Sequence, residues 1–457
     1  MTRSFRPADA GASGIQPESA AAQADSASDS GTGTSRRRLL AGAGVMSLAG
    51  LAATMVDNGS ASASVPATPT VPSVEGAAAA SPWPKLKFVG ARHGQFQLNG
   101  KPWHWGGTNC YYLHAQSHYM IDSMLNDAKA MSMQVVRAWA FFDGNTIGAL
   151  QTGPYEYDEA NFDSLDYAVY KAGQLGIRLV LPLVNNWPDY GGMQQYVKWF
   201  LDLPDDSYAA AVNHDRFYSD TQIRRCYLAY AAHVINRRNR YTGLRYKDDP
   251  TIMTWELANE PRNRSDPSGK TILRWADEVS RAIKHLAPRQ LVAIGDEGMG
   301  LSTGSTDYPY STYEGNRWLA LSSLKAVDYA TVHLYPQGWG RNASNGVDAI
   351  AWGSKWISDH IALGRTTLNK PVVIEEFGLK IEAATGIPDA ATRDRGYDAW
   401  LTEVEASGGA ATQFWILTAL TDAGIPYGDY DGFRVVYPSD TATLLTRHAL
   451  TLGTTVH

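Results

Sequence analysis

Eight short apolar segments, separated by longer amphipathic ones, are the feature that most limits how this chain can fold. Most are rich in β-branched residues and turn polar or aromatic toward their C-terminal ends. Apolar and polar residues do not alternate along these segments, so we expect both faces of each strand to be buried, as in a parallel sheet. The segments are residues 103–109, 133–141, 177–185, 251–259, 290–298, 327–335, 371–378 and 411–417.

Helical patterns lie between these segments, and the clearest cover residues 119–132, 164–176, 221–239 and 271–287. Strands that alternate with helices predict an α/β fold, a (β/α)8 TIM barrel. A doubly wound sheet is the alternative, but polar residues at nearly every strand's C-terminal end fit a barrel better. The length of 457 residues would otherwise suggest two or three domains, whereas a barrel of roughly 250 to 400 residues is one domain.

The N-terminal part of the chain differs in composition from the rest. Residues 1–34 are rich in Ala, Ser, Gly and Asp, and we expect them to be disordered. The arginines at 36–38 precede an apolar run over 39–56, and Ala-Ser-Ala at 61–63 offers a cleavage site. This pattern resembles a twin-arginine export signal and predicts a secreted, extracellular protein of a bacterium. A retained membrane anchor is the alternative, because a run of about 18 apolar residues is at the lower limit for spanning a bilayer.

A second segment of unusual composition follows the export signal. Residues 64–84 alternate proline with small residues, which is typical of an extended linker. The predicted organisation is therefore a leader and signal peptide over residues 1–63, this linker, and one folded domain over residues 85–457.

Charge and cysteine content exclude several classes of protein. The net charge is −6 and the isoelectric point is near 6.0, which favours neither nucleic acid nor an anionic membrane as a partner. The two cysteines, Cys110 and Cys226, could form one disulfide or remain as two buried thiols. Either arrangement excludes a disulfide scaffold and a cysteine-rich metal site.

Polar and aromatic residues gather where the predicted strands end, and a barrel brings such ends together at one face. The set contains carboxylates, amide and imidazole groups and aromatic rings, but no serine nucleophile elbow, phosphate-binding loop or H-E-x-x-H motif. Paired carboxylates with aromatic platforms are typical of glycoside hydrolysis. The residues are Asn109, Arg137, Asn185, Asn186, Trp187, Asn259, Glu260, Glu297, His333, Tyr335, Glu376 and Trp415.

Several segments of the chain resemble those of a known enzyme family. "VVRAWAF", "LVLPLVNNW", "YGGMQQYVKW", "YKDDPTIMTWELANEPR", "ATVHLYP" and "IEEFG" resemble the endo-β-1,4-mannanases of glycoside hydrolase family 5. The resemblance runs from about residue 88 to residue 433, and the match over 246–262 is its most specific part. It implies a (β/α)8 barrel, hydrolysis with retention of configuration, and no metal or organic cofactor.

The resemblance assigns two glutamates to catalysis. Glu260 is similar to the family's general acid/base and Glu376 to its nucleophile. We expect Arg137 and the hydroxyl of Tyr335 to keep Glu376 ionised, and the resulting charge to raise the pKa of Glu260. The remaining matched positions resemble the family's substrate contacts: Arg137, Asn259, His333, Tyr335, Trp415, Arg262, Trp187 and Asn186.

Two further glutamates lie close to the assigned pair in sequence. Glu256 has the same strand parity as Glu260 but lies deeper, so we expect a structural role in which it pairs with a buried cation or amide. Glu375 and Glu376 are adjacent and are expected to face opposite sides of their strand. The resemblance, and not the spacing, selects Glu376.

Other candidates have both a structural and a functional interpretation. Glu297 either lines the cleft or forms an ion pair in a loop. His114 and His118 are four residues apart, as two metal ligands on a helix would be, but no third ligand is apparent and a surface or cleft-edge role is favoured. Four aromatic residues in predicted loops could stack on sugars or pack in the core: Trp187, Tyr190, Trp199 and Trp339.

The function implied by the resemblance is a secreted, retaining endo-β-1,4-mannanase that acts as a monomer on mannan, glucomannan or galactomannan. No nucleic acid and no stable membrane association after signal removal are expected. An exo-acting β-mannosidase or mannobiohydrolase and a β-1,4-glucanase are the nearest alternatives. A non-catalytic carbohydrate-binding barrel and a surface-anchored structural protein are more distant ones.

Overall fold

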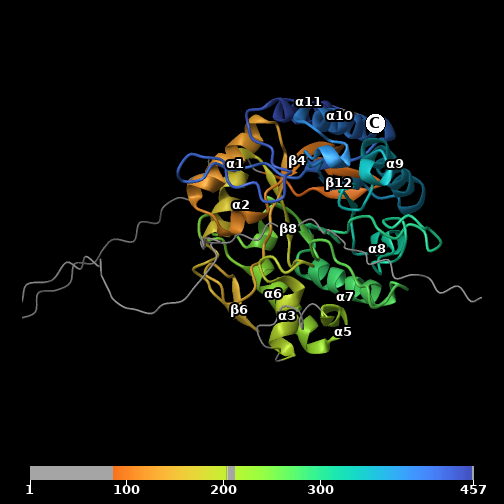
Figure 1. Cartoon of the computed structure of the whole chain (residues 1–457). Helices are drawn as coiled ribbons and strands as arrows, with labels where there is room; N and C mark the ends of the chain where they lie inside the picture. Colours follow the sequence, from red (N-terminus) through yellow and green to blue (C-terminus); the bar gives the residue numbers. More distant parts are fainter. Residues whose placement is uncertain (1–85, 202, 204–211, 455–457) are drawn as a thin grey trace, which may run out of the picture. The chain divides into compact units, whose positions relative to one another are not determined.

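One sheet of eight parallel strands forms the centre of the fold (Figure 1). The computed structural model describes residues 86–201, 203 and 212–454. The strand order is β10-β9-β8-β5-β4-β13-β12-β11, so each strand pairs with its neighbour along the barrel sequence. The strands are β4 (Trp105–Asn109), β5 (Val135–Arg137), β8 (Arg178–Pro182), β9 (Ile252–Glu256), β10 (Leu291–Ala293), β11 (Ala330–Leu334), β12 (Val372–Phe377) and β13 (Ala411–Phe414).

The two strands at the ends of this order are also joined. The backbone amide of Asp328 donates to the carbonyl of Val292 (2.8 Å), and the amide of His333 donates to that of Glu297 (3.0 Å). These bonds bring β10 and β11 together, so the sheet closes into a barrel. The predicted (β/α)8 fold is confirmed, each of the eight predicted segments contains one of these strands, and a doubly wound sheet is excluded.

Helices surround the barrel, as Figure 1 shows for α1, α2, α6, α7, α9, α10 and α11. Their amphipathic patterns bury one side, and side-chain caps fix several starts: Ser117 accepts from Met120, and Asp348 accepts from Ile350. The helices are α1 (His118–Ala130), α2 (Asp163–Leu175), α3 (Gly192–Phe200), α5 (Arg216–Ser219), α6 (Thr221–Asn236), α7 (Lys270–Leu286), α8 (Trp318–Ser322), α9 (Ala349–Leu363), α10 (Ala390–Ser407) and α11 (Asp440–Thr454). Short helical turns are η1 (Tyr111–Ala115), η2 (Tyr246–Asp248), η3 (Ala343–Asn345), η4 (Gly364–Leu368) and η5 (Ala383–Thr385).

A small antiparallel sheet that was not predicted covers the N-terminal end of the barrel. Its strands are β1 (Gly90–Arg92), β2 (Gln95–Leu98) and β3 (Lys101–Pro102). Phe96 on β2 packs against Trp105, which begins β4, and against Tyr329, which precedes β11. The opposite, C-terminal end is therefore left for the site. A second hairpin, β6 (Gln151–Gly153) with β7 (Glu156–Tyr157), follows β5.

The sequence predictions for the chain's N-terminal part concern residues outside the described ranges. The leader and signal peptide over 1–63 and the linker over 64–84 all lie there. Among the helices that the structure describes, none is both long and apolar enough to cross a membrane.

The two cysteines are not bonded to each other. Cys110 and Cys226 are both buried free thiols. The sulfur of Cys226 accepts a hydrogen bond from the side-chain amide of Gln151 (3.3 Å). Of the two arrangements left open by the sequence, the structure has the pair of separate thiols.

Candidate active site

Glu260 lies four residues beyond the end of β9 in an unusual backbone conformation. Its φ angle is +52°, a left-handed value that non-glycine residues adopt rarely and that is enriched at functional sites. The hydrogen bond from its amide to the carbonyl of Gly295 (2.9 Å) holds this turn. The carboxyl group then meets two nitrogens: Nδ1 of His333 lies 2.8 Å from Oε1, and Nε1 of Trp187 donates to Oε2 at 2.6 Å.

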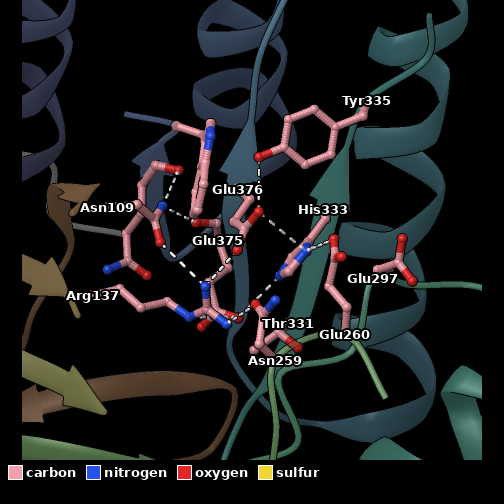
Figure 2. A network of polar contacts seen from close by, with 12 residues as sticks. Asn109, Arg137, Asn259, Glu260, Glu297, Thr331, His333, Tyr335, Glu375 and Glu376 are labelled. Carbon is pink, nitrogen blue, oxygen red and sulfur yellow. Dashed lines mark hydrogen bonds and ion pairs between the residues drawn. The ribbon is translucent and has the colours of Figure 1, made fainter. Parts of the chain in front are cut away.

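Glu376 lies on β12, three strands further along the chain, and is 3% exposed. Nη1 of Arg137 donates to its Oε1 at 2.5 Å, and the hydroxyl of Tyr335 donates to its Oε2 at 2.8 Å. Figure 2 shows Tyr335 above this carboxyl and Arg137 on its other side. Both contacts expected from the sequence are present.

Arg137, at the end of β5, is the hub of the site (Figure 2). Besides Glu376, its Nε donates to Glu256 (2.8 Å) and its Nη2 donates to Oδ1 of Asn259 (2.8 Å). Its Nη1 also donates to Oδ1 of Asn109 at 3.3 Å. The prediction that Glu256 pairs with a buried cation is confirmed, and that cation is the guanidinium beside Glu376.

His333 brings the two carboxyl groups into one cluster. Its Nδ1 lies 3.6 Å from Oε2 of Glu376 as well as 2.8 Å from Glu260. One oxygen of each glutamate and a ring nitrogen of His333 lie within 4.8 Å of one another. Carboxyl groups whose oxygens approach this closely fit the separation of about 5 to 5.5 Å in retaining glycosidases better than the roughly 6.5 to 9.5 Å of inverting ones.

The same cluster is the one group of residues in the described part of the chain with the spacing of a cation site. A dication there would lie beside the Arg137 guanidinium, which is 2.5 Å from Glu376. Like charges this close repel strongly in a buried site. The chemistry of the donors therefore favours organic acid–base work over metal binding.

The expectation that Glu375 faces away from Glu376 was wrong. Oε2 of Glu375 lies 3.7 Å from Nε of Arg137 and 3.4 Å from Nε2 of His333, in the same network. The register between β11 and β12 shifts here: Val332 pairs with Ile374, but His333 pairs with Glu376. Glu375 is thus the extra residue of a β-bulge, which re-aims side chains and breaks strict alternation.

The charges and hydrogen bonds around His333 favour a proton on its imidazole over a proton on Glu260. Burial opposes a charge on Glu260, but the hydrogen bond and charge of His333, together with Arg262 and Trp187, lower the Glu260 pKa to about 2. Burial also opposes a charge on His333, yet the charge of Glu376 and the hydrogen bonds to Glu260 and Glu375 raise the imidazole pKa well above its ordinary value. Both directions favour an imidazolium beside a carboxylate.

Glu376 shows the opposite shift from Glu260. Burial raises the pKa of its carboxyl, the negative charge of Glu260 adds to this effect, and the positive charges of His333 and Arg137 only reduce it. The sequence predicted a lowered pKa for Glu376 and a raised pKa for Glu260, and both directions were wrong for the free protein. Arg137 is shared among several buried carboxyls, so its effect on any one of them is limited.

A second network extends from Glu260 on the side of Trp187. Arg262 lies over the Trp187 ring, 4.9 Å from its centroid, and binds both oxygens of Glu297 at 2.6 Å. Its backbone amide donates to Oδ1 of Asn186 (3.1 Å). The ion-pair interpretation of Glu297 is confirmed, and the three predicted residues Arg262, Trp187 and Asn186 lie beside Glu260.

Trp415 forms the other flank of the site, just beyond β13. Its ring stacks on Tyr111, with centroids 5.5 Å apart and planes at 10°, and its Nε1 donates to Asp431 (2.7 Å). The indole is half-buried, so part of it remains exposed. Tyr111 and Asp431 were not predicted; Tyr111 follows the first barrel strand by two residues, which was the available signal.

Three of the aromatic candidates pack inside the protein. Trp199 lies in α3, not in a loop, and its ring is 5.3 Å from that of Tyr196. Trp339 is 8% exposed and packs against Trp352 and Trp356. Tyr190 is half-buried in a cluster with Tyr111, His114, Trp139 and Phe142. Of the four candidates, Trp187 alone contacts Glu260.

His114 and His118 do not form a shared ligand set. The buried ring of His114 has Nδ1 3.1 Å from the carbonyl of Tyr111. His118 instead places Nε2 2.9 Å from Asp163 and stacks on Tyr167 near the surface. The expected surface role therefore holds for His118, whereas it was wrong for His114, whose ring is buried.

Comparison with known proteins supports what the geometry indicates. A family model described as GH family 5 beta-mannosidase-like matches residues 86–422. The chain belongs to this family. The family is one of glycoside hydrolases, so the chain is an enzyme of that class, and its barrel and paired carboxyl groups fit the family's chemistry.

Individual relatives within the family agree with the assignment. Mannan endo-1,4-beta-mannosidase 2 of Oryza sativa subsp. japonica is 35% identical over 394 residues, which are 83% of this chain and 86% of that protein. The endo-beta-1,4-mannanase of Thermotoga petrophila is 39% identical with a TM-score of 0.70 and covers 78% of each chain. The endo-1,4-beta-mannanase of Rhizomucor miehei is 33% identical with a TM-score of 0.71 over 81% of this chain and 100% of that one.

Proposed function

We propose that this protein is a retaining endo-β-1,4-mannanase that hydrolyses internal bonds of mannan, glucomannan or galactomannan. The observation that carries the proposal is the approach of the Glu260 and Glu376 carboxyl groups to within 4.8 Å around His333. Relatives that share a third or more of the sequence over most of the chain are named mannan endo-1,4-beta-mannosidases or endo-mannanases. Those names supply the substrate class, which the carboxyl geometry alone does not.

In the first step Glu376 attacks the anomeric carbon while Glu260 gives a proton to the glycosidic oxygen. The bond to the leaving sugar breaks, and an ester forms between the sugar and Glu376. Glu260 first has to receive the proton of His333, which crosses the 2.8 Å from Nδ1 to Oε1. A sugar that displaces water from the cleft favours this transfer, because it raises the cost of the Glu260 charge.

In the second step Glu260 takes a proton from a water molecule, whose oxygen attacks the anomeric carbon. The ester bond to Glu376 breaks, and the product keeps the configuration of the substrate. The ester has no charge, so Glu260 loses the repulsion from Glu376 and is suited to act as a base. Arg137 and the Tyr335 hydroxyl stabilise the departing Glu376 carboxylate.

Substrate contacts surround the pair on both sides. Trp415 offers its ring face to the sugar at the cleavage site, where stacking on C–H bonds is favourable. Asn259, held by Arg137 and by its own hydrogen bond to Asn185 (3.0 Å), is assigned to the sugar 2-hydroxyl. Arg262, Trp187 and Asn186 are assigned to the leaving-group side.

The test is a time course of products from mannohexaose and galactomannan. Endo action releases mixtures of short oligomers from the start. Mannose alone or mannobiose alone would place the protein among the exo-acting enzymes. Cleavage of cellulose without cleavage of mannan would make it a β-1,4-glucanase, and no cleavage of either would support a non-catalytic binding barrel.

We further propose that residues 1–63 contain a leader and a twin-arginine signal, that residues 64–84 are a linker, and that the mature protein is secreted as a monomer. The support is the sequence pattern of three arginines, an apolar run and an Ala-Ser-Ala site. The mass of the secreted protein tests the proposal. A mature form that keeps the apolar run, or export that survives replacement of the arginines at 36–38 by lysine, contradicts it.

A further inference from the structure

Two carboxyl groups beneath the catalytic pair have no established role. Glu256 and Glu375 are both 0% exposed, and both contact Nε of Arg137, at 2.8 Å and 3.7 Å. Figure 2 shows Glu375 next to Glu376, on the side toward Arg137. Both side chains are fully buried, so neither contacts the scissile bond directly.

One oxygen of each carboxyl lacks an N–H partner. Oε1 of Glu256 and Oε1 of Glu375 are buried and accept no hydrogen bond from a nitrogen donor in the described residues. The two carboxyl groups instead contact each other as a side-chain pair. Two ionised carboxylates in contact would repel, whereas a single proton converts the contact into an O–H···O bond and satisfies both oxygens.

The surrounding charge also favours one proton in the pair. The groups that face it are Arg137, His333, Glu376 and the buried phenol of Tyr329. Even with a proton on His333, two positive charges face four buried carboxyl groups, those of Glu256, Glu260, Glu375 and Glu376. Burial and the charge of Glu375 raise the pKa of Glu256. Burial also opposes a charge on Glu375, but the charge of Arg137 and the hydrogen bonds from Glu256 and His333 lower the Glu375 pKa.

We propose that Glu256 is a neutral carboxylic acid that donates to an ionised Glu375, and that together they act as positioning residues for His333. Nε2 of His333 lies 3.4 Å from Oε2 of Glu375, so this carboxylate holds the Nε2 proton and leaves Nδ1 to exchange a proton with Glu260. Neutral Glu256 keeps its Oε2 as an acceptor for Arg137 without adding a third negative charge. The arrangement sets both the tautomer and the orientation of the ring.

Matched amide substitutions in the same pair test this proposal. Glutamine has the shape of a protonated glutamate, so Glu256→Gln keeps a donor to Glu375 and an acceptor for Arg137. We expect its kcat to fall much less than that of Glu375→Gln. Glu375→Gln removes the charge that holds the Nε2 proton, and we expect kcat to fall about 10- to 100-fold, as for other misplaced catalytic groups, with little change in KM and a shifted pH profile.

The outcomes of the activity assay separate the proposal from a purely structural role. Equal losses in both variants would overturn it, because an ionised Glu256 would need its charge as much as Glu375 does. Near-normal turnover with an unchanged pH profile in Glu375→Gln would overturn it as well. Melting temperatures report whether each variant is folded. If Glu375→Gln is not folded, Glu375→Asp takes its place, and the same fall in kcat and shifted pH profile are required.

The comparison of kcat values rests on the proposed function. A measurement that needs no substrate therefore tests the proton pair separately. Near neutral pH the wild type should show the infrared carbonyl band of a protonated carboxyl, and Glu256→Gln should lose that band. Asp143 is also buried with a raised pKa, so Asp143→Asn is the matched control and should remove a separate band. A Glu256→Gln difference spectrum without a lost band overturns the proton pair. A lost band in a protein that cleaves no glycan overturns only the proposed function.

Discussion

Nδ1 of His333 lies 2.8 Å from Oε1 of Glu260, so a single short hydrogen bond decides which of the two residues carries the proton of the site. In the free protein the surroundings favour the proton on the imidazole, because His333 also faces Glu376 and Glu375. A general acid that borrows its proton from a neighbour titrates together with that neighbour. The predictions below follow from this relationship and from the sharing of Arg137.

The loss of activity on removal of the Glu260 side chain should depend on the leaving group of the substrate. General acid catalysis contributes about 10²- to 10⁴-fold, so we expect Glu260→Ala to lose at least this factor on mannan. A dinitrophenyl mannobioside needs no proton on its leaving oxygen, and its first step should lose much less. Burst kinetics measure that step. A loss of the same size on both substrates would contradict the assignment of Glu260 as the acid.

Removal of Glu376 should abolish turnover on both substrates, because no other carboxyl can form the ester. We expect Glu376→Ala to retain the fold and to fall to the limit of detection. Mass spectrometry of the wild type after reaction with a 2-deoxy-2-fluoro-mannoside should find the sugar on the peptide that contains Glu376. Label on Glu375 instead would reverse the choice between these two adjacent residues.

The pH profile of kcat/KM should be a bell displaced toward higher pH. Glu376 attacks only when ionised, and burial raises the pKa of its carboxyl. The midpoint of the acid limb should therefore lie above about pH 4.3, the ordinary pKa of a glutamate. Proton donation needs the His333–Glu260 pair to hold one proton, and the His333 pKa is raised well above about 6.5, so activity should persist beyond that pH before it falls. An alkaline limb below about pH 6 would contradict the shared proton.

Removal of Arg137 should destabilise the fold as well as the site. Arg137→Ala leaves Glu256, Glu375 and Glu376 buried without their shared cation, and breaking a buried pair costs about 3 to 5 kcal/mol. Arg447→Ala is the control, because its ion pair with Asp398 is exposed and is worth no more than about 1 kcal/mol. Urea denaturation of both variants measures the difference in free energy of unfolding. Equal losses would show that the Arg137 network does not stabilise the fold.

The barrel itself was predictable from local sequence. Strands such as β8 and β12 are buried on both faces, and that condition leaves apolar runs, here residues 179–184 and 372–374, that can be recognised without any knowledge of partners. The end of each strand then places Arg137, Glu260, His333 and Glu376 at one face of the barrel, because parallel strands share a direction. Recognition of the family pattern added which glutamate has which proposed role.

What the tertiary structure decided depends on contacts between strands. The side on which Glu375 lies was mispredicted because strict alternation was assumed along β12. The register between β11 and β12 shifts between Val332 and His333, and this shift interrupts the alternation. The pKa directions of Glu260 and Glu376 were mispredicted because they depend on His333, 73 residues from Glu260 in sequence yet 2.8 Å away in space. Local sequence thus determined the strands and which residues reach the rim, whereas the placement of the proton required the three-dimensional packing of charges that no single strand contains.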